Sequence, residues 1–277
     1  MRLGTSSPLA HATPEEWADN QRKLGCSTVV FPVQSNEPEE KIIAYKKAAD
    51  NAGLTIAEVG IWRNALAADP DERKINTDYC IEQLRLADFV GARCAVNVAG
   101  AFGPVWDGGY RANFSDEAWK QTIAMVQDII DRADIKNTCF TLEPMPWMLP
   151  TGPEEYLKLI DAVDRDRFAV HMDIINMINS SERYFYAEEF IDKCAALLGD
   201  RIRSCHIKDV HLSSKYTLRL EECGPGAGEF PLRHYAEKMS SIDPDMPIIL
   251  EHLSSDEDYI HYMEYLKKEL SGLYVTL

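Results

Sequence analysis

Three carboxylates and one histidine in the second half of the chain lie at or near the ends of short strand-like runs. Glu143 follows CFTL, Asp173 follows FAVHM and Glu251 follows PIIL, whereas His206 lies inside SCHIK. Three carboxylates at one place repel one another unless a cation joins them. Three oxygen ligands and one imidazole suit Mn²⁺, Mg²⁺ or Co²⁺ better than structural zinc, which prefers sulfur and nitrogen. We therefore expect one divalent metal ion, with Mn²⁺ as the first choice, bound by Glu143, Asp173, His206 and Glu251.

These side chains can share an ion only if the runs that carry them are neighbouring strands. Eight runs rich in Val, Ile and Phe are expected strands: 2–7, 27–32, 55–62, 94–100, 139–144, 168–173, 203–209 and 247–252. Most of them lack polar alternation, which is typical of parallel strands buried on both faces. Amphipathic stretches between them are expected helices: 13–25, 39–53, 71–91, 115–133, 152–163, 186–199, 232–241 and 255–272.

Eight alternating strand–helix units in 277 residues predict an α/β fold, a single (β/α)8 TIM barrel domain spanning residues 1–277. A doubly wound open sheet is the alternative, although the first strand and turn, SSPLAHAT, lack a GxGxxG fingerprint. In a TIM barrel the active site lies at the carboxyl ends of the strands. Neighbouring strands are ~4.8 Å apart. The last four strand ends are therefore expected to surround one cation.

Composition excludes several classes of protein. The formal net charge of −16 argues against binding to nucleic acid, which requires a basic surface. No apolar run reaches the ~18 residues of a membrane span, and MRLGTSSPL does not resemble a signal peptide. Seven dispersed cysteines without a CxxC pair predict buried thiols in the cytoplasm, with Cys205 beside His206 as the one catalytic alternative.

Six further residues are candidates for binding a substrate: Trp62, Trp106, Trp147, His171, Asn176 and Lys208. The tryptophans follow expected strands, and their faces suit sugars or a flat aglycone, with ordinary loop packing as the alternative. His171 shares a strand face with Asp173, and core packing remains open for it. Lys208 either contacts substrate or pairs with a carboxylate, and Asn176 either binds substrate or caps a turn.

Five motifs carry a family resemblance: TLEP (141–144), HMDIIN (171–176), CHIKD (205–209), GPGAGEF (224–230) and ILEH (249–252). With them the second half resembles the xylose isomerase-like TIM barrels, which include tagatose/psicose 3-epimerases, inosose dehydratases, hydroxypyruvate isomerases and endonuclease IV. The resemblance implies that Glu143, Asp173, His206 and Glu251 are metal ligands. It also implies that Glu143 and Glu251 exchange protons with a carbon beside a carbonyl, through an enediolate.

The resemblance favours a sugar isomerase or epimerase that acts on a carbohydrate or glycoside, and the composition argues against membrane or nucleic-acid partners. Two positions depart from the epimerase pattern, since Asn176 replaces a His and Leu212 replaces an Arg. C-glycoside deglycosidase catalytic subunits, which eliminate an aglycone from 3-oxo-glucosides, share the barrel and the ligand set and are the first alternative. A non-catalytic sugar-binding or assembly subunit is the second. A homo-oligomer is expected, or a hetero-oligomer with a small β-sandwich subunit for a deglycosidase.

Overall fold

Parallel strands form the centre of the fold, in the hydrogen-bonded order β1-β10-β7-β6-β5-β4-β3-β2. The computed structural model describes residues 1–277. The strands are β1 (Arg2–Thr5), β2 (Thr28–Val30), β3 (Thr55–Gly60), β4 (Cys94–Asn97), β5 (Phe140–Leu142), β6 (Phe168–Met172), β7 (Ile202–Ile207) and β10 (Pro247–Leu250). The outermost strands of this order meet, because Ser27 N–H donates to the Leu3 carbonyl at 2.8 Å. The sheet is thus a nearly closed barrel, and the predicted (β/α)8 fold is confirmed.

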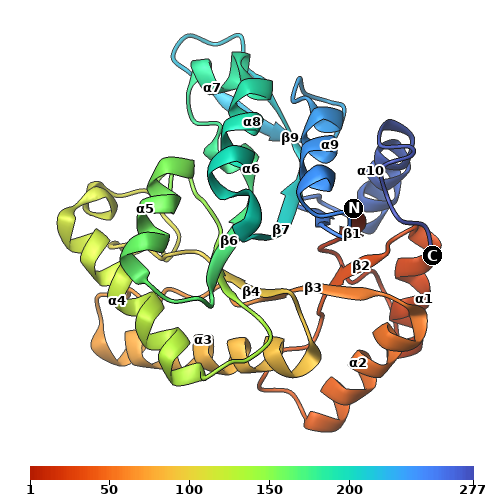
Figure 1. The fold of residues 1–277 in the computed structure, drawn as a ribbon, viewed down its shortest axis with the longest axis horizontal. Helices are drawn as coiled ribbons and strands as arrows, with labels where there is room; N and C mark the ends of the chain where they lie inside the picture. The colour runs from red at the N-terminus through yellow and green to blue at the C-terminus, as the bar shows by residue number, and fades with distance from the viewer.

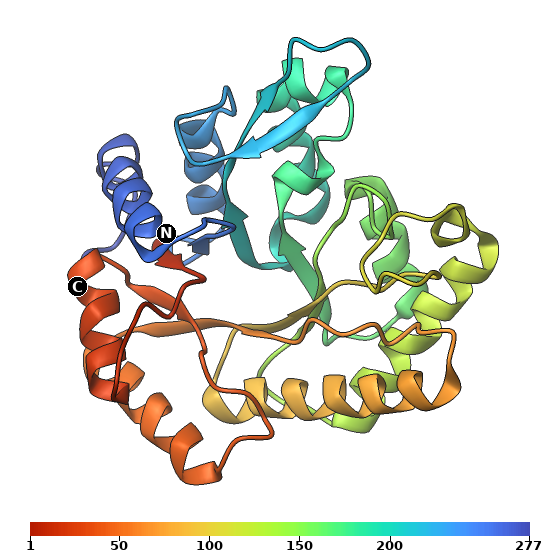
Figure 2. The same ribbon diagram turned by 180° about the vertical axis from the view of Figure 1, so that it is seen from behind.

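The main helices surround this barrel on its outside (Figures 1 and 2). They are α1 (Pro14–Leu24), α2 (Glu39–Ala52), α3 (Pro70–Val90), α4 (Asp116–Ala133), α5 (Pro153–Val163), α8 (Ala187–Leu198), α9 (Leu232–Ile242) and α10 (Asp256–Glu269). Local sequence explains where they begin and end. The Thr13 side chain caps α1 by accepting the Glu16 N–H, and Gly25 ends the helix at φ 97°. None of the helices combines the length and apolar composition that a membrane crossing needs.

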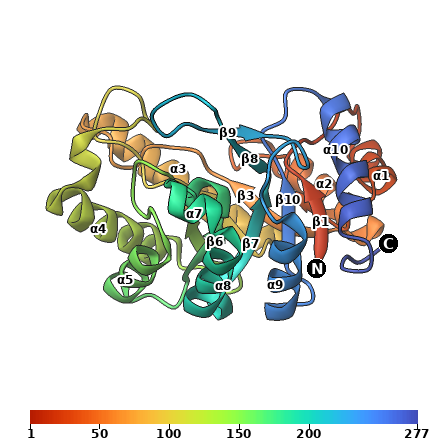
Figure 3. The same cartoon turned by 90° about the horizontal axis from the view of Figure 1, so that it is seen from above.

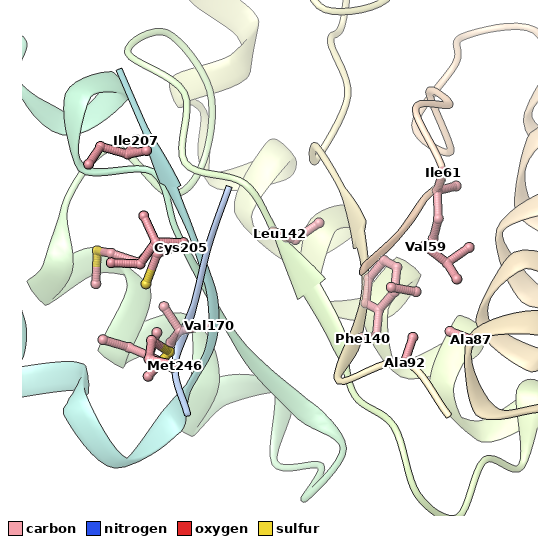
Figure 4. Packing of buried hydrophobic residues seen from close by; sticks show 14 of the residues in the cluster. Val59, Ile61, Ala87, Ala92, Phe140, Leu142, Val170, Cys205, Ile207 and Met246 are labelled. Carbon is pink, nitrogen blue, oxygen red and sulfur yellow. The ribbon is translucent and has the colours of Figure 1, made fainter. Parts of the chain in front are cut away.

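Most apolar side chains are buried between the barrel and its helices. One cluster of 71 residues fills this layer, and Figure 4 shows part of it, with Phe140 of β5, Val59 of β3 and Ala87 of α3. A second cluster has only four members, which come from β4, β6 and the residue before β5: Cys94, Val96, Cys139 and Ala169. Because side chains alternate between the two faces of a strand, this small set marks the barrel interior. The interior is therefore left largely to polar side chains.

Segments at the carboxyl ends of the strands depart from the predicted pattern. The stretch 211–222, expected to be a loop, forms an antiparallel hairpin of β8 (Asp209–Leu212) and β9 (Leu220–Cys223), which lies at the upper edge of Figure 3. Four short helices were not predicted: η1 (Arg111–Phe114), α6 (Ile174–Met177), α7 (Ser181–Phe185) and η2 (Gly199–Arg201). Most strands also stop two or three residues earlier than predicted, because the chain leaves the ladder to build these loops. The open doubly wound alternative is wrong, since the strand order closes on itself.

All seven cysteines are free thiols, and six of them are buried, as the sequence predicts. Burial raises the pKa of Cys205 to about 12, so its sulfur stays protonated near neutral pH. A neutral buried thiol is a poor nucleophile, and the structure gives no support to the catalytic alternative.

Candidate metal centre

Each of the four candidate ligands is held by the end of a strand. Glu143 directly follows β5, and its N–H continues the ladder by donating to the Asn97 carbonyl at 2.7 Å. Asp173 caps α6 by accepting the Asn176 N–H through Oδ1 at 3.1 Å, which leaves Oδ2 for other partners. His206 lies in β7, and Glu251 follows β10. The adjacent register of these strands, with Ile249 beside His206, brings the side chains to one place.

The structure brings all four expected ligands together in a buried cluster. One donor atom from each of Glu143, Asp173, His206 and Glu251 lies within 4.8 Å of the others. His206 Nδ1 is central, at 2.8 Å from Glu251 Oε2, 3.3 Å from Glu143 Oε1 and 3.7 Å from Asp173 Oδ2. None of the four residues is more than 5% exposed. Such a buried set of three carboxylates and one imidazole is typical of a divalent metal site.

The donor atoms fit a metal ion better than a network of hydrogen bonds. His206 Nδ1 is buried and has no hydrogen-bond partner, although it is 2.8 Å from Glu251 Oε2. Asp173 Oδ2 is also buried, and no donor reaches it with the geometry of a hydrogen bond. Ligands of a shared cation lie close together in this way, without pointing a hydrogen-bond donor at an acceptor. The residues therefore fit one divalent ion.

Lys208 brings a positive charge to the cluster. Its Nζ lies 2.6 Å from both Asp173 Oδ2 and Glu251 Oε1, and 3.4 Å from Glu222 Oε2 of β9. Burial opposes its charge, but these carboxylates outweigh burial and raise the pKa of Lys208 well above its usual value. Two roles were expected for Lys208, contact with substrate or pairing with a carboxylate, and in the structure it pairs with carboxylates.

The two glutamates have opposite electrostatic environments. Burial, followed by the nearby charge of Glu251, raises the pKa of Glu143 to about 8. Burial would also raise the pKa of Glu251, but His206 and Lys208 outweigh it and hold this pKa at about 2. Burial opposes the charge on His206, yet Glu251 and Glu58 raise its pKa well above the usual value. At neutral pH the protein's own charges thus keep Glu143 protonated and Glu251 ionised.

A second polar layer lies in the barrel interior behind His206. Glu58 of β3 places Oε2 3.3 Å from His206 Nε2 and Oε1 3.5 Å from His171 Nδ1. His171 is fully buried, and its Nδ1 is 2.8 Å from Ser204 Oγ. Its ring meets the His206 ring edge-on, with centroids 4.1 Å apart. His171, expected among the substrate-binding candidates, is therefore in contact with this inner layer.

A cavity of about 450 Å³ opens beside the cluster. Asn176 and Glu222 connect the two, because Asn176 Nδ2 donates to Glu143 Oε1 at 3.2 Å and Glu222 contacts Lys208. The rest of the lining is mostly apolar: Pro146, Trp147, Ile175, Ile178, Asn179, Val210, Leu218 and Leu220. Trp147 is 41% exposed, and its indole N–H donates to the Asp107 carbonyl. Trp62 and Trp106, which are also part-exposed, do not line this cavity.

Comparison with known proteins identifies the family of the chain. A family model described as xylose isomerase-like TIM barrel matches residues 18–269. The chain belongs to the xylose isomerase-like TIM barrel family. No curated protein sequence matches it at a significant level.

Solved structures similar to this family member include two epimerases. D-psicose 3-epimerase from Clostridium cellulolyticum H10, solved with D-tagatose, has a TM-score of 0.70 at 14% identity, over 99% of this chain and 100% of that chain. The E. coli 3-keto-D-glucoside 4-epimerase has a TM-score of 0.71 at 15% identity, over 97% and 99%. A xylose isomerase-like TIM barrel protein from Mycobacterium smegmatis, in complex with magnesium, has a TM-score of 0.69 at 17% identity, over 98% and 95%. At these identities the likeness concerns the fold.

In this xylose isomerase-like barrel, sequence reasoning missed two charged residues near the cluster. Glu58 is the only charged residue in TIAEVG, a run otherwise free of charge, and that isolation was the available signal. Glu222 gave no such signal, because it lies in a stretch predicted to be a loop. It reaches Lys208 and His252 only because the β8–β9 hairpin folds over the strand ends.

Proposed function

We propose that the protein is a divalent-metal-dependent sugar isomerase or epimerase that moves a proton at a carbon beside a carbonyl. The observation that carries this proposal is the buried cluster in which two glutamates, an aspartate and a histidine converge within 4.8 Å. Membership of the xylose isomerase-like family supports it, and so do the epimerases among the similar folds. When bound, the ion would neutralise negative charge that develops on the substrate oxygens. We propose Mn²⁺ as this ion, with Mg²⁺ or Co²⁺ as alternatives.

The two glutamates are the proposed acid–base pair. A C–H bond beside a carbonyl is only weakly acidic, so the reaction needs a carboxylate close to that carbon and a second group that returns the proton. Glu143 and Glu251 are the two glutamates of this buried cluster, and they are held at the carboxyl ends of β5 and β10. One glutamate would accept the substrate proton, and the other would return a proton to the resulting enediolate.

The neighbouring residues would hold the sugar. Trp147 and Asn176 line the cavity beside the cluster and are proposed to contact the substrate. Lys208 is proposed to donate to a substrate oxygen from its place between Asp173 and Glu251. Trp62 and Trp106 are proposed to extend the binding surface at the rim. His171 is proposed to support the site from within the barrel.

The proposal is tested by metal content and by solvent exchange. The purified protein is expected to hold one Mn²⁺ per chain and to incorporate deuterium from D₂O into a ketose at the carbon beside the carbonyl. Glu143→Gln should abolish this incorporation, whereas the control Glu188→Gln, at an exposed position of α8, should retain it. A wild-type protein that neither binds metal nor exchanges deuterium with any sugar would contradict the proposal. That outcome would favour a sugar-binding or assembly subunit.

The apolar cavity favours one second candidate, a lyase that acts on 3-oxo-glucosides. Trp147, Leu218 and Leu220 offer an apolar surface beside the cluster, where the aglycone of a glycoside would fit. Proton removal beside a 3-keto group would then expel the aglycone by β-elimination. Aglycone release from 3-oxo-glucosides, without exchange into free ketoses, would favour this reading. Co-purification of a small β-sandwich protein would favour it further.

A further inference from the structure

Glu58 is a buried carboxylate that the proposed proton transfer does not use. It is 1% exposed and comes from β3, which is separated from β7 by three other strands in the sheet. Its contact with His206 therefore crosses the interior of the barrel. A carboxylate in such a place costs free energy unless it is bonded to a polar partner. The polar partner of Glu58 is His206, a candidate metal ligand, and this suggests a role for Glu58 in metal binding.

The two ring nitrogens of His206 face different groups. Nδ1 points into the cluster of Glu143, Asp173 and Glu251, and Nε2 lies 3.3 Å from Glu58 Oε2. An ionised carboxylate only accepts hydrogen bonds, so Nε2 must carry the proton that joins it to Glu58. A neutral imidazole with its proton on Nε2 has a free lone pair on Nδ1. That is the form in which Nδ1 can bind a cation.

The inner layer also fixes the orientation of the His206 ring. His171 packs edge-on against this ring at a centroid distance of 4.1 Å. His171 is in turn held by Ser204 Oγ at 2.8 Å, and Ser204 Oγ lies 3.2 Å from Cys94 Sγ of β4. Glu58 thus contacts the edge of the His206 ring that faces away from the cluster, while His171 contacts the ring from the side. The imidazole has little freedom to turn.

We propose that Glu58 is a positioning residue that accepts the Nε2–H of His206, fixes the tautomer with Nδ1 free, and thereby strengthens binding of the divalent ion. This inference rests on the proposed role of His206 as a metal ligand. Carboxylates that hold a ligating histidine in this way typically change metal affinity about 10- to 100-fold. The same atoms allow one rival, a second ion bound between Glu58, His171 and His206.

The test is a calorimetric titration of the metal-free full chain with Mn²⁺. The wild type is expected to bind one ion. Glu58→Ala should weaken the affinity about 10- to 100-fold, and Glu58→Gln should weaken it less, because the amide oxygen still accepts the Nε2–H. Cys139→Ala is the matched control, since it alters the small apolar cluster of the barrel interior and leaves the contacts of Glu58, His171 and Ser204 in place, and it should leave the affinity unchanged. A merely structural role for Glu58 would lower the unfolding temperature of both Glu58 variants and leave their affinities equal to that of the wild type, which would overturn the inference.

The other outcomes separate this inference from the proposed function. A wild type that binds no Mn²⁺ contradicts the proposed function, and the inference with it. Two ions per chain would place the second beside Glu58 and would overturn the hydrogen-bonded role alone. If Glu58→Ala does not fold, nitrogen NMR of the Mg²⁺-loaded wild type with labelled histidine decides. A protonated Nε2 and a bare Nδ1 on His206 support the inference, and the reverse tautomer overturns it.

Discussion

Binding of a divalent ion to the cluster should release two protons near neutral pH. Burial and Glu251 raise the pKa of Glu143 to about 8, and the surrounding carboxylates raise the pKa of His206 well above its usual value. Both groups therefore hold a proton at pH values near 6.5, and both must lose it to bind a cation. Lys208 keeps its proton, because Asp173 and Glu251 raise its pKa.

The size of the effect follows from the proton count. Each released proton makes the affinity rise about tenfold per pH unit, which is about 1.4 kcal/mol. Two protons therefore predict an affinity for Mn²⁺ that rises about a hundredfold per pH unit, or about 2.7 kcal/mol. This rise should lessen as the pH approaches the pKa of Glu143, because the carboxyl is then already ionised. The Nε2 proton of His206 stays on the ring in this scheme, bonded to Glu58.

Calorimetry in two buffers with different ionisation enthalpies counts the protons directly. The apparent binding enthalpy should change with buffer in proportion to the two protons taken up by the buffer. Glu143→Gln removes one titrating group and should release one proton fewer. An affinity that stays constant as the pH rises, with no dependence on buffer, would refute this account of the cluster's charges.

Three further outcomes concern stability, each measured by urea denaturation. Tyr156→Phe should cost about 1–3 kcal/mol, because the buried Tyr156 hydroxyl contacts both backbone polar groups of Leu142, the residue before Glu143. Asp209→Ala should cost at least about 3 kcal/mol, since the buried Asp209 carboxylate accepts four backbone N–H groups. The metal-free protein should lose stability as the pH rises from about 6.5 to 8. The raised pKa values of Glu143 and His206 mean that the folded state binds more protons than the unfolded chain in this range, whereas at lower pH the pKa of His171, which burial lowers to about 4, offsets the effect of Glu143. A constant stability over this range would contradict the charge assignment.

The strand–helix rhythm and the ligand cluster could be predicted from sequence because both rest on local signals. A carboxylate such as Glu143 at the end of an apolar run is visible without knowing the fold. The barrel then brings successive strand ends together, so Glu143, Asp173, His206 and Glu251 meet once the topology is right. To predict the cluster, it was enough to know the position of each residue within its own strand.

Contacts across the barrel or between loops could not be predicted in this way. Glu58 meets His206 only because the sheet closes and brings β3 to face β7, and nothing near Glu58 in sequence indicates that partner. The β8–β9 hairpin depends on Asp209, whose carboxylate binds the backbone of the glycine-rich turn at Gly226 and Gly228. A tertiary anchor of this kind leaves little trace in hydrophobic periodicity.

The β8–β9 hairpin has a consequence for how the protein could be re-engineered. Leu218, Leu220 and Glu222, which form one wall of the cavity, all belong to this hairpin, whereas the ligand cluster is built on β5, β6, β7 and β10. One wall of the cavity and the ligand cluster are thus carried by separate segments of the chain. Grafting a hairpin of different length between Asp209 and Cys223 should change the size of the accepted molecule while the ion site keeps its donors. The hairpin is therefore the segment to randomise in a directed-evolution library.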